Sequence, residues 1–547
     1  MRVTSAEKPC TSAAGASLVD RQAHTVSGKK TSAMSLTSGL HRTRQQQPER
    51  VVTWFGDRQR TYGEMADRVA RIAAVFTESG VKAGDRIAML GVNSDRYLEF
   101  YLASWWAGAI ASPVNTRWSA AEIVYSLNDA GTRVLLVDRA FLHLVPEIEA
   151  QTQALETILF FDDGAAPIGM PDLEYLIEHA APAEDVGRQR DDPAVIFYTG
   201  GTTGVPKGVV LSHFNLWAAA MSRMAMSWSS PDAVGLHVAP LFHVAAAGRM
   251  IAHTLIGGAA VIVPSFRPDE VIAIIERHAV ADVVLIPSML QMLLAHPDFD
   301  PARLKSLRRI TYGGSAISES VLDQALSLLP DVEFIQSYGM TEAVPPVTLN
   351  PHESHVGEGR KLGRLRSAGR AIYGVQLKIV DEQGRETAPG VAGEIVTQGP
   401  NVMLGYWGKP EETAKALRGG WLHTGDGGYL DQDGYLYVVD RLKDMIITGG
   451  ENVYPAEVEN AIARHEAVAA NAVIGIPSDT WGEGVHAVVV LKHGAALTLA
   501  ELQAHCKGLI AGYKCPKSVE FKESLPMSPV GKVLKTVLRQ PHWPSAK

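Results

Sequence analysis

Apolar side chains follow a helical period where the regular part of the chain begins. Past Thr61 they recur three or four positions apart, at Met65, Val69, Ile72 and Phe76. This spacing predicts a helix with one buried face, ending at Gly80. Strands are then predicted at 86–90, 109–113 and 134–137, with helices at 95–107 and 119–127 between them. Such alternation indicates a parallel sheet covered by helices.

The pattern changes after about Val375. Short alternating strands at 375–380, 393–396 and 434–439 are separated by Gly and Asp turns, which indicates a small β-rich subdomain. From Arg441 a separate unit is predicted, with helices at 455–463 and 498–509 and strands at 472–476, 486–491 and 518–521. The expected fold class is therefore α/β, with a large N-terminal domain of stacked α/β subdomains plus a β-rich subdomain, and a small α+β C-terminal domain.

Composition narrows the class of protein. The chain has 547 residues, of which 46% are hydrophobic, and a net charge of −8, so it lacks the basic field of a nucleic-acid-binding protein. The three cysteines form neither a metal spacing nor a disulfide framework, which favours a reducing compartment, expected to be the cytoplasm. No apolar run has the length of a membrane span. Residues 1–35 are expected to be a disordered tail, or to precede a natural start at Met34, with domains at 36–440 and 441–547.

The stretch from Tyr198 to Gly208 carries the strongest chemical signal. It follows a predicted buried strand at 194–197 and combines glycines, threonine hydroxyls and one lysine: Thr199, Gly200, Gly201, Thr202, Thr203, Gly204 and Lys207. Glycines allow successive backbone N–H groups to surround an anion, so the stretch predicts a phosphate cradle. It is not a Walker A loop, because Gly208 follows the lysine where Ser or Thr is required. An ordinary Gly/Thr-rich surface loop is the alternative.

Further polar motifs lie where a core would not need them. Two of them, Tyr312 to Ala316 and Gln336 to Glu342, follow predicted strands and place backbone groups at the carboxyl edge of a sheet, where α/β proteins bind ligands. The other motifs are His243 in an apolar run, Asp426 at an expected tight turn, the charged stretch 440–444, and Lys532 on a Pro/Gly loop. Taken singly, each is also compatible with a core histidine, a plain turn or a surface charge.

Together, the order and spacing of these motifs resemble the adenylate-forming superfamily of acyl-CoA synthetases, carrier-protein adenylation domains and firefly-type luciferases. The resemblance runs from about Thr61 to Leu538. It implies that residues 199–204 and Lys207 grip the phosphates of ATP, although Gly200 stands where many relatives have serine. The adenine pocket is implied at Gly314, Ser315, Ala316, Gln336, Ser337, Tyr338, Gly339 and Met340. Thr341 is implied at the α-phosphate, Glu342 and Thr202 at Mg²⁺, and Asp426, Val438 and Arg441 at the nucleoside.

The resemblance also implies a two-step reaction. A carboxylate attacks the α-phosphate of ATP to give an acyl-adenylate and pyrophosphate, and a thiol then displaces AMP. Lys532 is implied as the catalytic cation of the first step, and His243 is implied to orient the carboxylate. The C-terminal domain is expected to be mobile and to rotate about Lys443 between the steps. Coenzyme A is expected to meet Gly449, Gly450, Glu451, Trp481, Lys514 and Lys517.

The acid is expected to be apolar. An adenylation domain for amino acids usually has an aspartate after the phenylalanine that Phe242 matches, and His243 stands there instead. The expected lining is Phe242, His243, Ala245, Ala246, Ala247, Tyr312, Gly313 and Gly314, which suits a fatty acid or an aryl acid of cinnamate type, such as ferulate. The main interpretation is an AMP-forming carboxylic acid–CoA ligase that uses ATP, Mg²⁺ and CoA, as a monomer or a homodimer.

Three alternatives remain. One is an enzyme that loads the acyl group onto a carrier protein. A second is a luciferase-type oxygenase, since most of its motifs are shared with ligases. The third is a non-enzymatic binding protein on the same fold, which predicts the loss of Lys532, Glu342 or Asp426, and all three are present.

Overall fold

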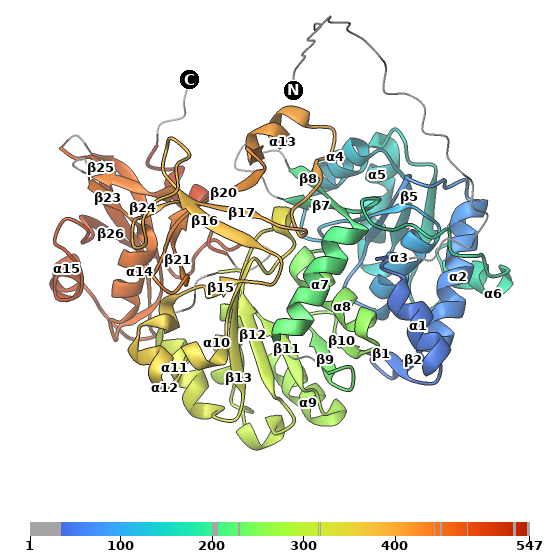
Figure 1. The fold of residues 1–547 in the computed structure, drawn as a ribbon, viewed down its shortest axis with the longest axis horizontal. Helices are drawn as coiled ribbons and strands as arrows, with labels where there is room; N and C mark the ends of the chain where they lie inside the picture. Colours follow the sequence, from blue (N-terminus) through green and yellow to red (C-terminus); the bar gives the residue numbers. More distant parts are fainter. Residues whose placement is uncertain are drawn as a thin grey trace, which may run out of the picture. The chain divides into compact units, whose positions relative to one another are not determined.

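The structure, a computed structural model, describes residues 34–199, 206–227, 230–315, 317, 319–441, 444–448, 451–478, 480–528 and 532–543. The expectation for residues 1–33 therefore lies outside the described residues. Within the described part, the fold is mixed α/β, with a large N-terminal domain that contains several sheets and a smaller C-terminal domain (Figure 1). The position of the boundary near residue 440 stays a prediction.

A seven-stranded sheet holds the first predicted strands. Its order is β18-β8-β7-β4-β3-β5-β6, with bounds β3 Arg86–Leu90, β4 Ile110–Pro113, β5 Thr132–Val137, β6 Thr157–Phe160, β7 Pro193–Thr199, β8 Lys207–Ser212 and β18 Gly405–Tyr406. The centre is parallel, as predicted, while β8 and β18 pair antiparallel. Strands β7 and β8 flank the predicted phosphate cradle and pair as far as Thr199 and Lys207, so the two ends of that stretch lie side by side.

A nine-stranded sheet forms the second layer. Its order is β15-β14-β13-β12-β11-β9-β10-β1-β2, with bounds β1 Val51–Phe55, β2 Arg58–Thr61, β9 Val234–His237, β10 Ala259–Ile262, β11 Asp282–Leu285, β12 Arg309–Gly313, β13 Glu333–Tyr338, β14 Thr348–Asn350 and β15 Arg370–Ala371. The strands from β10 to β13 are parallel to one another. Stacked α/β subdomains were expected, and the two sheets confirm them.

Helices lie between the two sheets. Helix α2 (Tyr62–Glu78) begins with a capping box between Thr61 and Glu64 and buries the predicted apolar face. Helix α3 (Asp95–Trp106) is buried along its whole length because it contacts β1 of one sheet and β3 of the other. Helix α7 (His213–Ser227) contacts β8, and α8 (Val244–Ile256) contacts α7, β9 and β10 (Figure 1). One layer of helices therefore serves both sheets.

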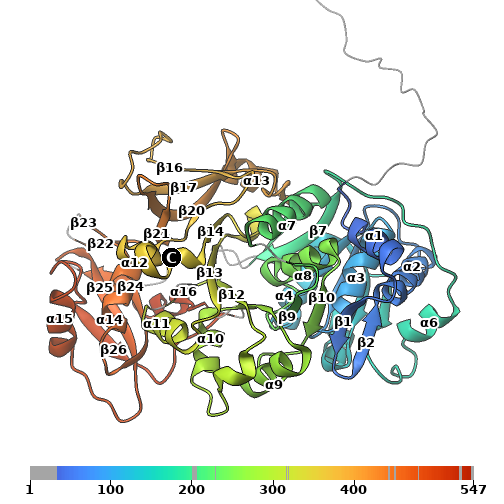
Figure 2. The same ribbon diagram turned by 60° about the horizontal axis from the view of Figure 1, so that its bottom comes forward.

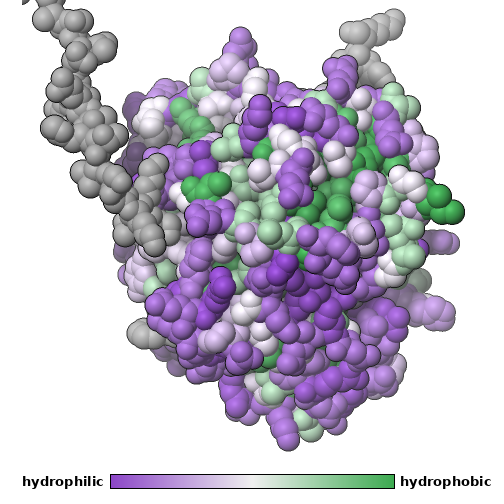
Figure 3. All heavy atoms as spheres, turned by 90° about the vertical axis from the view of Figure 1, so that its right-hand side faces the viewer, coloured by the Kyte–Doolittle hydropathy of each residue, from purple (hydrophilic) through white to green (hydrophobic). Residues whose placement is uncertain are grey.

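The other helices of the N-terminal domain connect or cover these strands. They are α1 Ser38–Gln46, α4 Ala120–Ala130, α5 Val145–Gln151, α6 Leu173–His179, α9 Pro268–His278, α10 Pro287–Leu294, α11 Glu319–Leu328, α12 Gly357–Lys361 and α13 Pro410–Ala416. No helix in the described ranges is both long and apolar enough to cross a bilayer. Figure 3 shows a largely hydrophilic face of the molecule, with hydrophobic side chains gathered in its upper half.

A five-stranded antiparallel sheet forms the β-rich subdomain. It contains β16 Gln376–Val380, β17 Gly393–Gln398, β19 Leu417–Arg418, β20 Trp421–Leu430 and β21 Leu436–Arg441 (Figure 2). The expected tight turn at Asp426 is wrong, because Asp426 lies inside β20 and pairs with Arg441 of β21. Gly425, at φ +71°, and the register shift after Gly427 bend the strand while keeping it paired, and the sequence shows that glycine only as a turn signal.

The C-terminal domain has its own sheet and core. The strands are β22 Ile446–Thr448, β23 Glu451–Val453, β24 Val468–Ser478, β25 Gly482–Leu491 and β26 Ser518–Phe521, and the helices are α14 Pro455–Ala463, α15 Leu499–Lys507 and α16 Lys535–Arg539. Proline opens α14 and a Thr498–Glu501 capping box opens α15, close to the predicted starts. Cys506 and Cys515 are free thiols buried in this core.

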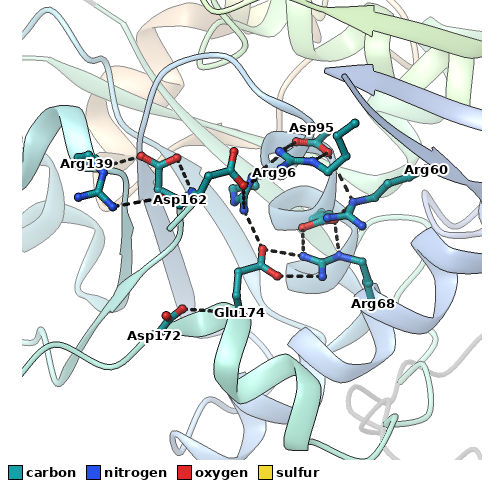
Figure 4. Close-up of polar contacts among 11 residues, drawn as sticks. Arg60, Arg68, Asp95, Arg96, Arg139, Asp162, Asp172 and Glu174 are labelled. Carbon is teal, nitrogen blue, oxygen red and sulfur yellow. Dashed lines mark hydrogen bonds and ion pairs between the residues drawn. The ribbon is translucent and has the colours of Figure 1, made fainter. Parts of the chain in front are cut away.

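A network of charges ties β2, α2, α3 and α6 together. Glu99 is fully buried and accepts a hydrogen bond from Arg68 Nε. Arg68 Nη2 also donates to Glu174 Oε1 at 2.9 Å. Arg96 binds Glu174 at 2.9 Å, and Asp95 accepts from Arg58. Figure 4 shows the arginines converging on these carboxylates. Since buried carboxylates need paired cations, we read this network as structural.

Candidate active site

The two predicted strand-to-glycine motifs meet at one edge of the nine-stranded sheet. Strands β12 and β13 run parallel, and Gly313 faces Ser337 in register. A Cβ on Gly313 would lie 2.2 Å from the Ser337 carbonyl oxygen, so no larger residue fits there. Gly314 follows at φ +83° and turns the chain out of the sheet. Strand β13 continues through Tyr338, three residues beyond the predicted strand, and carries its motif residues to the edge.

Tyr338 connects this edge to the β-rich sheet. Its hydroxyl donates to Asp426 Oδ2 at 2.8 Å, and Asp426 is only 8% exposed. The backbone N–H of Asp426 donates to Thr424 Oγ1 at 3.1 Å, which fixes the strand at that point. The structure thus brings together two residues predicted for the same nucleoside from segments 88 positions apart. One carboxylate oxygen is held, and an ionised carboxylate retains further acceptor sites.

Glu342 is held in the same way. Tyr406 of β18 donates its hydroxyl to Glu342 Oε1 at 2.9 Å, and Glu342 is 8% exposed. The Lys207 ammonium lies 5.2 Å from the centre of the Tyr406 ring, within cation–π range. Tyr406 therefore joins the lysine of the cradle stretch to the carboxylate predicted for the metal.

Sequence reasoning missed Tyr406. It lies 64 positions from Glu342 and reaches the site only because β18 pairs antiparallel with β8. A two-residue strand gives no hydrophobic period, so no sequence signal was available.

His243 stands just before α8, with its backbone N–H donating to the Pro240 carbonyl. Burial, together with the positive charges of Arg117 and Lys532, lowers the pKa of His243 to about 3. The imidazole is therefore neutral at neutral pH. Its buried Nε2 has no hydrogen-bond partner among the described residues. Lys532 is therefore near enough for its charge to act on the His243 ring, and both residues are predicted to act on the acid.

The residues predicted for the acid differ in burial. Phe242, Ala246 and Ala247 are buried, while Ala245 is exposed at the start of α8. The Phe242 and His243 rings lie 4.5 Å apart. Tyr312 is fully buried and its hydroxyl bonds His355 Nε2 at 2.7 Å, so this side chain is engaged below the strand edge.

The residues predicted for CoA lie on the C-terminal domain. Glu451 and Trp481 are exposed, and Trp481 is 51% exposed between β24 and β25. Lys514 contacts both oxygens of Glu457 at 2.7 Å, and Lys517 donates to the Gly512 carbonyl at 3.2 Å. Both lysines already have partners within their own domain.

Several predicted site residues lie outside the described ranges. They are Gly200, Gly201, Thr202, Thr203, Gly204, Ala316, Lys443, Gly449 and Gly450. The side chain of Arg441 is also not described, although its backbone pairs with Asp426. The remaining predicted residues are Ser315, which follows β12, Gln336 within β13, Gly339, Met340 and Thr341, which follow β13, and Val438 of β21.

The comparison with known families is consistent with this arrangement. The family model of the AMP-binding enzymes matches residues 40–407, more than half of the chain. The chain belongs to this family. The model of the AMP-binding enzyme C-terminal domain matches residues 457–532, which include most of the C-terminal sheet.

Curated and solved proteins extend the AMP-binding enzyme match along the chain. Feruloyl-CoA synthase of an Amycolatopsis species is 41% identical over 90% of this chain and 96% of its own length. Fatty acid–[acyl-carrier-protein] ligase ScoC of Streptomyces coeruleorubidus is 36% identical, over 88% of this chain and 92% of its own. The o-succinylbenzoate CoA synthetase of Bacillus subtilis, solved with an acyl-adenylate, has a TM-score of 0.80 at 31% identity, covering 92% and 97%. This AMP-binding enzyme is an ATP-dependent, AMP-forming acid–CoA ligase.

Proposed function

We propose that this ligase activates an aryl acid of the cinnamate class, with Glu342, Asp426, His243 and Lys532 as its central residues. The observation that carries the residue assignment is the pair of buried carboxylates, each held by a tyrosine hydroxyl. Buried acceptors oriented before the substrate arrives need no rearrangement when ATP binds.

Asp426 is proposed to accept the ribose hydroxyls. Its Oδ2 accepts from the Tyr338 hydroxyl, and an ionised carboxylate is an acceptor-only group of about four lone-pair sites, which suits O–H donors such as the two ribose hydroxyls. The glycines at 314 and 339 would let the adenine approach the backbone, with Tyr338 beside it. A Cβ on Gly339 would lie 2.9 Å from Pro345 Cβ, so this turn also excludes larger residues.

Glu342 fits a hard divalent cation such as Mg²⁺. The carboxylate is buried, one oxygen accepts from Tyr406, and the other oxygen is available for a cation that prefers oxygen ligands. Glu342, with Thr202, would hold the ion, which neutralises phosphate charge when bound. Tyr406 orients the carboxylate, and Lys207 adds a positive charge beside it.

The first step needs cationic charge where negative charge develops. An oxygen of the acid attacks the α-phosphorus, the bond to pyrophosphate breaks, and a mixed anhydride forms. Lys532 supplies a positive charge close enough to His243 to lower its pKa. Neutral His243, with its proton on the unpartnered Nε2, can donate to the acid carboxylate and hold it in line.

In the second step the thiol sulfur of CoA attacks the acyl carbon and AMP leaves. We propose that the C-terminal domain, beginning at residue 441, rotates about Lys443 so that Lys532 leaves the site. Gly449, Gly450 and Glu451 would then line the thiol path. Trp481 presents an exposed ring for the CoA adenine, whereas Lys514 must release Glu457 before it can bind a phosphate.

The acid class rests on two supports. Ala246 and Ala247 are small, buried and apolar and follow Phe242 closely in the sequence, and an aromatic ring suits an apolar lining of this kind. Feruloyl-CoA synthase is 41% identical over 90% of this chain. A fatty acid is the second candidate, because a pocket discriminates one methylene by only about 1–3 kcal/mol.

The test is pyrophosphate release with ATP, Mg²⁺ and CoA across cinnamates, benzoates, fatty acids of increasing length and amino acids. We expect ferulate or a related cinnamate to give the highest kcat/KM, with AMP and acyl-CoA formed in equal amounts. Preference for a fatty acid would overturn the acid class but keep the ligase. Turnover with amino acids alone would contradict both the lining and the role of His243.

The acceptor is tested separately, because ScoC, a carrier-protein ligase, is 36% identical. The same acid is offered with CoA or with a carrier protein that bears phosphopantetheine. Multiple turnover with CoA supports the proposal. A single burst of pyrophosphate with CoA and turnover with the carrier protein would favour the alternative acceptor.

We also place the enzyme in the cytoplasm, where ATP and CoA are available and the free thiols Cys506 and Cys515 stay reduced. The oligomeric state stays a prediction, either monomer or homodimer.

A further inference from the structure

Two histidines and a glutamate converge on the C-terminal domain, apart from the residues assigned to ATP, acid or CoA. His486 lies on β25, Glu520 on β26, and His542 follows α16. One nitrogen of each histidine and one carboxylate oxygen all lie within 4.8 Å of one another. The two rings are tilted at 52°, with centres 4.9 Å apart.

His486 is already oriented as a metal ligand. It is 5% exposed, and its Nδ1 contacts the Ser518 hydroxyl at 2.7 Å. With Nδ1 donating to Ser518, Nε2 keeps its lone pair, and this buried Nε2 has no hydrogen-bond partner among the described residues. In many protein metal sites, the ligating histidine donates its other ring N–H to a nearby oxygen, and this hydrogen bond fixes the tautomer.

His542 is held beside β25 by contacts on both sides in the sequence. Its backbone N–H donates to the Arg539 carbonyl, and Arg539 Nη1 binds Asp444 Oδ1 at 2.7 Å. The next residue, Trp543, donates its indole N–H to the Gly475 carbonyl at 3.1 Å. The chain end therefore returns to the sheet at the level of His486.

We propose that His486, Glu520 and His542 form a binding site for a divalent transition-metal ion, with Zn²⁺ as the best match. Two imidazoles and one carboxylate are a ligand set that Zn²⁺ favours, and three protein ligands leave a fourth position for water. Tetrahedral ligands about 2.0–2.1 Å from Zn²⁺ lie about 3.3 Å apart, so the side chains must close slightly. Glu520, whose side chain is 42% exposed, and partly exposed His542 have room to do so.

One nearby charge opposes metal binding. Lys522 contacts Glu520 Oε1 at 2.7 Å, so the ion must use the other carboxylate oxygen or displace the ammonium. The site therefore predicts moderate affinity, raised when Lys522 is neutralised. A bound ion would connect the chain end to β25 and β26.

The test uses the full-length chain without a histidine tag, stripped of metal, in excess Mg²⁺ so that oxygen-rich sites are filled. Co²⁺ is the probe, because tetrahedral Co²⁺ has visible d–d absorption. We expect one equivalent to bind and Zn²⁺ to displace it. His542→Ala and Glu520→Gln should each weaken Co²⁺ binding at least about tenfold, as ligand and second-shell losses do. Ser518→Ala should weaken it less.

The matched control is His493→Ala, a histidine on an exposed loop of the same domain. It should bind Co²⁺ like the parent, and circular dichroism should show that every variant folds. The proposal is overturned if the parent gives no d–d bands. It is equally overturned if His542→Ala and His493→Ala bind Co²⁺ with the same affinity. Neither readout depends on ligase activity.

Discussion

The nucleotide side and the C-terminal side of the candidate site are built differently. Glu342 and Asp426 are nearly buried, and each receives a tyrosine hydroxyl from another part of the chain. Lys532 and Trp481 are exposed, and their backbone N–H groups donate to the side chains of Ser528 and Ser478 in their own domain. The groups proposed to hold the nucleotide are therefore buried and preordered, whereas those proposed to exchange between the steps are exposed.

The largest effect should come from the exchangeable side. Lys532→Ala removes the positive charge near His243, and loss of one group that stabilises developing charge costs on the order of 10²–10³ in rate. Adenylation, measured as pyrophosphate release, should fall by that factor. Thioester formation from a supplied acyl-adenylate should be retained. Equal loss of both half-reactions would contradict the separation between the two sides.

The metal carboxylate offers the next test. Tyr406→Phe removes the hydroxyl that orients Glu342 but keeps the ring beside Lys207. Losing a residue that hydrogen-bonds a metal ligand typically weakens metal affinity about 10–100-fold. The Mg²⁺ concentration for half-maximal adenylation should therefore rise by a similar factor. The matched control is Tyr373→Phe, which removes the hydroxyl of an exposed tyrosine. If the Mg²⁺ requirement did not change, Tyr406 would have no role in binding the metal.

A smaller effect is expected at the ribose. Tyr338→Phe removes one hydrogen bond to Asp426, worth about 1–3 kcal/mol to a charged group. The KM for ATP should rise roughly tenfold, while the KM for the acid stays constant. A change in the KM for the acid alone would show that Tyr338 lines the acid pocket instead.

The smallest effect concerns stability in acid. Burial lowers the pKa of His243 to about 3 and of His213 and His355 to about 4. In the unfolded chain these groups bind protons from about pH 6.5. The unfolded state therefore binds more protons below pH 6.5, and folding stability falls as the pH drops toward 4.

Each of these histidines contributes at most about 1.4 kcal/mol per pH unit to this loss. Melting temperature measured from pH 7 to pH 5 should decrease, and His355→Asn should reduce the slope. An equal slope in the parent and in His355→Asn would contradict the burial of the His355 ring. The same neutrality predicts no inflection from His243 in the rate profile above pH 5.

Much of the fold could be predicted because the spacing of apolar residues that indicates a helix or a strand is a local property of the sequence. The face of α2 and the starts of α14 and α15 follow from spacing, proline and capping residues. Asp426 shows where this fails, since its flanking glycines read as a turn but lie within a paired strand. Pairing between distant strands, which the local sequence does not record, overrode the turn signal.

The same limit applies to the candidate site, whose residue roles stay predictions. The sequence indicated the motifs at 312–316 and 336–342, because glycines follow apolar runs there. Tyr406 and the His486–Glu520–His542 cluster did not, because their partners lie on other strands and no fixed spacing relates them. Contacts made only by tertiary pairing therefore stayed hidden until the structure placed them.

The buried cysteines of the C-terminal core have a consequence for fidelity. An acyl-adenylate is an electrophile that any thiolate nearby could intercept. Burial raises the pKa of Cys506 to about 11 and also raises that of Cys515, so neither thiol is ionised at neutral pH. The two thiols of the C-terminal domain are therefore held in their less nucleophilic form, which disfavours their acylation by the adenylate.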